Sequence, residues 1–136
     1  MMTRVSAPGP TGRTTPPAGA RLRGGLRRLR NRPSLRGVDV VRDVTFADPE
    51  PGGPLRLDVY RPSGATRAPR PAVVTVHGGG FASGSRRWVG AVSAELARRG
   101  YVTFAIQYRF GPGFAFPAPF DDLSDAVGWV LSLIHI

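Results

Sequence analysis

Two short runs in the middle of the chain are predicted to be strands, and the second of them alternates between apolar and polar positions. Residues 38–46 are rich in Val and end in Phe46, and residues 55–60 place Leu55, Leu57 and Val59 between polar neighbours. A period of two is typical of a strand with one face in solvent. Because residues 47–54 are dense in Pro, Gly and Asp, the pattern predicts an antiparallel hairpin or a pair of adjacent edge strands.

The segments that follow change to other periods. Residues 72–76 are apolar throughout, which is typical of a strand covered on both faces by helices. Residues 86–99 have helical spacing, with Ser85 as a cap and Gly100 as an exit, and residues 101–108 form another apolar strand. A second helix is expected to start at Asp121 or Asp122. The two apolar stripes are Trp88, Val89, Val92 and Leu96, and then Leu123, Val127, Val130 and Leu131.

The order of these elements is strand, strand, strand, helix, strand, helix. Its later part alternates, which predicts a right-handed βαβ unit with parallel strands. The fold class is therefore α/β, with antiparallel first strands and one domain over residues 36–131. Trp88 and Trp129 are expected in its core.

The net charge of +10 is concentrated near the N-terminus. Residues 1–36 hold nine Arg and no acid, whereas residues 37–136 hold 10 Arg and 9 acids, a balance of 10 − 9 = +1. Residues 1–35 are also rich in Pro and Gly, so we expect a disordered basic tail. A solvated arm is the favoured interpretation, and a nucleic-acid contact is the alternative.

Other classes of protein are disfavoured by composition. The chain has no Cys, which excludes disulfides and thiolate metal sites. It has no apolar run of about 20 residues for a membrane span, and no secretory segment of about 7–15 apolar residues. We therefore expect a cytoplasmic protein without a membrane span, a metal or a cofactor.

Three consecutive glycines, Gly78 to Gly80, directly follow the apolar strand and His77. Glycine permits a backbone with positive φ whose N–H groups point into a cleft, where they can hold a developing oxyanion. A phosphate cradle is the rival interpretation. It is disfavoured because the chain has no Lys, and because the first acid after the glycines, Glu95, lies within the predicted helix.

Four segments resemble the hormone-sensitive-lipase-like and feruloyl-esterase-like α/β-hydrolases. They are LDVYRP (57–62), HGGGFASGS (77–85), ARRGYVTFAIQYRFGP (97–112) and FAFPAPFDDLSDAVGWV (114–130). HGGG is similar to the oxyanion loop of that family. The resemblance covers about residues 38–130 and implies an esterase or lipase that acts on a small-molecule ester.

The resemblance also implies roles for individual residues. The backbone N–H groups of Gly79 and Gly80 would face the substrate oxyanion, and Gly78 would permit the turn. His77 would hold the loop by hydrogen bonds and would not be the catalytic base. Phe81 would line the substrate pocket, or else be ordinary packing. Structural roles are implied for Tyr108, Arg109, Asp121 and Asp122, with helix capping as an alternative for the two Asp.

The catalytic triad of such an enzyme is missing from the chain. No GxSxG occurs, and Ser83 is flanked by Phe81 and Ser85 where Gly is required. The nucleophile of the family follows the second helix, so His135 and the Asp residues precede it. Residues 132–136 (SLIHI) resemble a translated sequencing adapter, with a continued helix as the alternative. We therefore expect the N-terminal part of an esterase, inactive by itself.

A non-catalytic binding protein of the same fold is the second hypothesis. In that case the Arg-rich arm, residues 1–36, would contact nucleic acid or an anionic surface. A GxSxG within about 20–30 residues beyond Leu131 would favour the enzyme. A salt-sensitive DNA complex that is lost when residues 1–36 are deleted would favour the binding protein.

Overall fold

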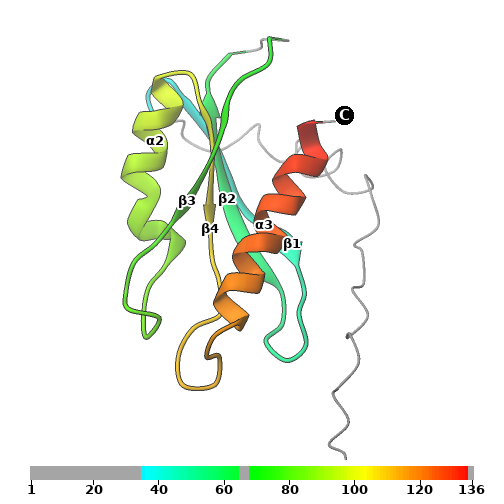
Figure 1. Cartoon of the computed structure of the whole chain (residues 1–136). Coiled ribbons are helices and arrows are strands. Elements are labelled where there is room, and N and C mark those ends of the chain that lie inside the picture. Colours follow the sequence, from blue (N-terminus) through cyan, green and yellow to red (C-terminus); the bar gives the residue numbers. More distant parts are fainter. Residues whose placement is uncertain (1–34, 65–67, 135–136) are drawn as a thin grey trace, which may run out of the picture.

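The computed structural model describes residues 35–64 and 68–134, which build a four-stranded sheet with helices on both faces (Figure 1). The strands lie in the order β1-β2-β4-β3. They are β1 (Val38–Ala47), β2 (Leu55–Pro62), β3 (Ala72–Val76) and β4 (Val102–Ile106). The helices are the short 3₁₀ helix η2 (Arg86–Val89), α2 (Gly90–Arg98) and α3 (Ala118–Ile134).

The pairing of the strands confirms the predicted fold class. β1 and β2 pair antiparallel, from Val38 opposite Pro62 to Ala47 opposite Leu55. β2 is also antiparallel to β4, whereas β3 is parallel to β4. The segment from β3 through α2 to β4 is therefore the predicted βαβ unit.

Each face of the sheet has its own core, because alternate residues of a strand point to opposite faces. The core beneath α3 contains Phe46, Leu55, Leu57, Phe104, Ile106, Ala126 and Val130. The core beneath α2 contains Val38, Tyr60, Ala94, Ala97 and Ala105. β1, β2 and β4 each contribute to both cores.

Two expectations about strand burial were wrong. The continuous apolar run of β3 predicted cover on both faces, but β3 is an edge strand, and its last residue, Val76, is 41% exposed. The alternation in β2 predicted one wet face, but Asp58 and Tyr60 on that face are buried. The reason is the strand order, since β4 lies between β2 and β3 and leaves β2 internal.

The helices bury only part of the predicted stripes: Val130 is buried, and Leu123 and Val89 pack against the cores. In η2 and α2, Trp88 and Val92 are 63% and 59% exposed, and the buried residues are Ser93, Ala94 and Ala97. Small side chains let this helix lie close to the sheet, which the larger residues would prevent. The prediction that Trp88 belongs to the core was therefore wrong.

α3 begins at Ala118, earlier than the predicted Asp121 or Asp122. Its buried stripe includes Ala126 and Val130, whereas Val127 and Leu131 are 45% and 51% exposed. Trp129 packs against the core beside Phe104, as expected.

Some expectations lie outside the described residues. These include the tail over residues 1–34 and His135. α3 continues to Ile134, so no change of secondary structure occurs at Leu131. Within the described part of the chain, no helix is long and apolar enough to cross a membrane.

Candidate functional site

The loop that follows β3 makes a tight turn built on glycine. Gly79 and Gly80 have φ of 129° and 60°, which is left-handed backbone that favours glycine. The carbonyl of Gly79 accepts hydrogen bonds from the N–H groups of Ala82 and Ser83, at 3.1 and 3.2 Å. In a trans peptide the C=O and N–H groups point in opposite directions. The N–H of Gly80 is therefore directed away from the turn.

Close packing makes the glycines necessary at two positions. A Cβ on Gly79 would lie 1.8 Å from the carbonyl oxygen of Ser83. A Cβ on Gly84 would lie 2.0 Å from Nδ1 of His77. Gly80 has open space around its Cβ position. Within the described residues, the backbone N–H groups of Gly79 and Gly80 donate no hydrogen bond. They are thus available to an acceptor from outside the loop.

His77 begins this turn and is buried, with an exposed fraction of 2%. Its Nδ1 lies 2.9 Å from the carbonyl oxygen of Gly78. Its ring stacks on Tyr108 with 4.4 Å between centroids, and the Tyr108 hydroxyl donates to the His77 carbonyl at 3.1 Å. Burial raises the pKa of Tyr108, so this donor stays protonated at neutral pH.

Gln107 was not singled out from the sequence, but the structure places it against His77. Its Nε2 lies 3.1 Å from Nε2 of His77, and its Oε1 accepts from the backbone N–H of Arg86 at 3.1 Å. Gln107 comes just after β4, next to the strand that precedes the glycine turn. The only sequence signal was a polar residue at the end of an apolar strand.

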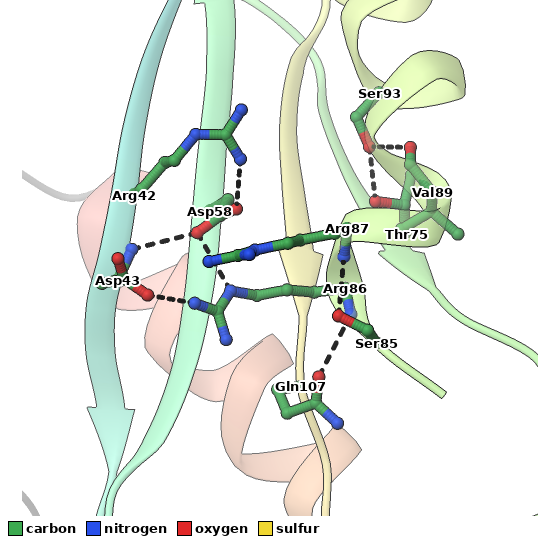
Figure 2. A network of polar contacts seen from close by, with 10 residues as sticks. All are labelled: Arg42, Asp43, Asp58, Thr75, Ser85, Arg86, Arg87, Val89, Ser93 and Gln107. Carbon is green, nitrogen blue, oxygen red and sulfur yellow. Dashed lines mark hydrogen bonds and ion pairs between the residues drawn. The ribbon is translucent and has the colours of Figure 1, made fainter. Parts of the chain in front are cut away.

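Arg86 is held by a buried carboxylate that the sequence analysis also missed (Figure 2). Asp58 is fully buried, and its oxygens accept from Arg86 Nε at 3.0 Å, Arg42 NH1 at 2.9 Å and the backbone N–H of Asp43 at 3.0 Å. A second ion pair joins Arg86 to the carboxylate of Asp43. These contacts fix the start of η2 to β1 and β2.

Arg109 and Asp122 form a separate buried pair between the end of β4 and α3. The guanidinium contacts both carboxylate oxygens, at 2.7 Å from NH2 and 3.0 Å from Nε. The backbone N–H of Arg109 also donates to Asp122, at 2.7 Å. The carboxylate raises the pKa of Arg109. Asp122 thus connects α3 to the segment that follows β4. Its contacts are those of an ion pair with Arg109, and not those of a helix cap.

Phe81 is exposed at the end of the glycine turn. Its side chain is 65% exposed, and its φ of 58° is unusual for a residue with a Cβ. Its carbonyl accepts from the N–H of Gly111 at 2.8 Å, and its ring meets Tyr108 edge-on at 6.2 Å. The ring therefore lies on the surface next to the turn, where an incoming molecule can touch it.

Two hollows on the described surface, of about 650 and 580 Å³, do not reach the glycine turn. The larger one is lined by Arg42, Arg87 and Arg98, beside α2. In residues 35–64 and 68–134, no cluster of three His, Asp or Glu could hold a metal ion. The groups that the glycine turn presents are the backbone N–H groups of Gly79 and Gly80.

The BD-FAE family model matches residues 57–133, which is more than half of the chain. The matched region runs from β2 into α3 and includes the glycine turn with His77 and Gln107.

Several similar proteins are named esterases, and one is named a deacetylase. The hyperthermophilic esterase of the archaeon Pyrobaculum calidifontis is 42% identical, with a TM-score of 0.57 over 72% of this chain and 30% of that chain. Esterase LipC of Mycobacterium tuberculosis is 36% identical over 54% of this chain and 18% of its own length. Arylacetamide deacetylase of Bos taurus is 33% identical over 68% of this chain and 22% of its own length.

This chain spans less than a third of the length of each of these three proteins. Over the part that it does span, its sequence is similar to all three and its fold is similar to that of the archaeal esterase, which confirms the resemblance to α/β-hydrolase esterases. The chain belongs to the BD-FAE family.

Proposed function

We propose that this chain supplies the oxyanion-binding part of a serine carboxylic-ester hydrolase. The observation that carries the proposal is the glycine turn, where the N–H groups of Gly79 and Gly80 have no acceptor among the described residues. Such N–H groups stabilise the negative charge that develops on the carbonyl oxygen as an ester is attacked. Because the turn is already folded, the donors need no reorganisation during the reaction.

The remaining groups for catalysis would come from sequence beyond this chain. Ester hydrolysis in this fold uses a serine in GxSxG, a base and an acid, and no GxSxG occurs in residues 1–136. The serine would attack the ester carbonyl, forming a tetrahedral intermediate whose oxygen faces Gly79 and Gly80. The intermediate would then expel the alcohol and leave an acyl-serine, and attack by water would release the acid and free the serine. This chain is therefore expected to be inactive by itself.

The proposed substrate is a small-molecule ester with a short acyl group. The proteins with similar sequences are named esterases and a deacetylase, which supports this class. Phe81 is proposed to contact the substrate, because its exposed ring lies directly beside the turn.

A chimera tests this function. Residues 38–131 would replace the matching segment of the Pyrobaculum calidifontis esterase, and hydrolysis of p-nitrophenyl acetate and butyrate would be measured. We expect a folded chimera to hydrolyse these esters. In Gly79→Ala the added Cβ would clash with the carbonyl oxygen of Ser83 and displace the turn. Displaced N–H groups should lower kcat by about 100–1000-fold with little change in KM, because the donors act in the transition state.

Gly113→Ala is the matched control, since its Cβ position is open and its φ is not positive. It should leave kcat unchanged. A chimera that melts cooperatively and is labelled by a fluorophosphonate, yet hydrolyses neither ester, would count against the proposal.

A further inference from the structure

Three hydrogen bonds connect the fixed core of the domain to the glycine turn. The N–H of Arg86 donates to Oε1 of Gln107 at 3.1 Å, Nε2 of Gln107 lies 3.1 Å from Nε2 of His77, and Nδ1 of His77 lies 2.9 Å from the carbonyl oxygen of Gly78. Figure 2 shows the first of these bonds, next to the ion pairs of Asp58.

The direction of every bond in this series is set by its two ends. A backbone N–H can only donate, so the atom of Gln107 that faces Arg86 is the amide oxygen. The amide nitrogen then faces His77, and because it can only donate, Nε2 of His77 must be unprotonated. At the other end, the carbonyl of Gly78 can only accept, so Nδ1 of His77 must carry the proton.

The orientation of the Gly78 carbonyl determines that of the next N–H. The peptide bond between Gly78 and Gly79 is trans, since cis bonds among the described residues occur only before Pro51 and Pro117. Its C=O and N–H groups therefore point in opposite directions. When Nδ1 of His77 holds the carbonyl of Gly78, the N–H of Gly79 points away from the His77 ring.

We propose that Gln107 is a positioning residue, which selects the neutral Nδ1–H tautomer of His77 and thereby aims the N–H of Gly79 at the substrate oxygen. Gln107 itself touches neither the substrate nor the reacting atoms. Its amide is oriented by Arg86, whose position is fixed by the buried carboxylate of Asp58. The role of Gln107 in directing the N–H of Gly79 toward the substrate rests on the proposed function. The tautomer of His77 can be measured without assuming that function.

Nitrogen NMR of the full chain tests the tautomer directly. The chain has two histidines, His77 and His135, so ¹⁵N-histidine labelling gives two ring spin systems, and a His135→Asn sample assigns them. We expect His77 to show a protonated Nδ1 and an unprotonated Nε2 at neutral pH. If the chain associates, magic-angle spinning reads the same shifts from sedimented protein. An Nε2–H tautomer, or the averaged shifts of a free imidazole, would overturn the proposal.

Gln107→Glu provides the matched perturbation, because it keeps the shape and replaces the donor by a carboxylate. One oxygen can still accept from Arg86, and the other then faces Nε2 of His77. We expect Nε2 of His77 to become protonated. Glu95→Gln is the control, as this exposed residue on α2 pairs with Arg98 and Arg99, and it should leave the signals of His77 unchanged.

Gln107→Met removes both the donor and the acceptor at similar size, and it is informative if the carboxylate variant does not fold. We expect the His77 nitrogens to move toward a mixture of tautomers. A folded Gln107→Glu or Gln107→Met chain whose His77 spectrum equals that of the wild type would overturn the proposal.

The chimera separates this inference from the proposed function. In an active chimera, Gln107→Met should lower kcat by up to about 100-fold with KM nearly unchanged, since a small misplacement of a donor has an effect of that size. If the chimera is inactive while His77 has the expected tautomer, the esterase function fails and the hydrogen-bond series stands. If the chimera is active and the tautomer differs, only the role of Gln107 fails.

Discussion

Replacing Asp122 by Ala should strongly destabilise the domain, because it removes the carboxylate that is paired with the largely buried guanidinium of Arg109. Asp122 is fully buried, and the Arg109 side chain is 13% exposed. The carboxylate accepts from Nε and NH2 of Arg109 and from the backbone N–H of the same residue. The variant therefore leaves a buried charge without its partner and a backbone donor without its acceptor.

The expected loss is about 3–5 kcal/mol, the usual cost of breaking a buried ion pair from one side. A small domain has a free energy of unfolding of about 5–15 kcal/mol, so the loss is a large fraction of the total. At about 4–8 °C per kcal/mol, the melting temperature should fall by at least about 12 °C.

Urea unfolding followed by tryptophan fluorescence measures this loss, since Trp129 packs edge-on to Phe104 in the core. Asp121→Asn is the control, because its side chain is exposed and it should cost only about 0.3–1 kcal/mol through the helix dipole. Combining Asp122→Ala with Arg109→Leu should recover part of the stability, because the unpaired charge is removed as well. An Asp122→Ala chain that loses less than about 1 kcal/mol would refute the reasoning.

Three further predictions concern other positions. Gly84→Ala should lower the melting temperature far more than Gly80→Ala, since only the first would drive a Cβ into His77; equal effects in thermal melts would contradict this. Gly128→Ala, in open space on α3, should stabilise by about 0.5–1 kcal/mol in urea unfolding. Burial and neighbouring carboxylates raise the pKa of Asp125, so its contribution to stability is present below the ordinary pKa and lost as pH rises through the raised one. Asp125→Asn should therefore be more stable than wild type at neutral pH, by a few tenths of a kcal/mol after solvent screening, and equal to it below about pH 4.

The apolar pattern was sufficient to predict which segments form strands and helices, but it was insufficient to predict which faces are buried. β1, β2 and β3 begin where their runs predicted, because a strand depends on its own alternation and on the turn residues that flank it. The helical faces depend on the distance to the sheet. α2 lies so close to the sheet that the small residues Ser93, Ala94 and Ala97 face the strands, and Trp88 stays exposed.

The candidate site divides in the same way. His77 and the three glycines are consecutive, and a short motif of this kind is visible in the sequence because one turn uses neighbouring residues. Gln107 is 30 residues away from His77, and Asp58 is 28 residues away from Arg86. No local pattern marks either pair, since the contacts exist only when β4 lies between β2 and β3.

By itself, the sequence determined the α/β class, the order of the elements and the glycine turn after β3, because each depends on residues that are close together along the chain. The tertiary structure alone decided that Asp58 is buried, that β3 is an edge strand and that Gln107 faces His77. These features depend on the order of strands across the sheet. Hydrogen bonds and ion pairs between strands are formed by spatial neighbours, and spatial neighbours are set by the packing of the whole domain.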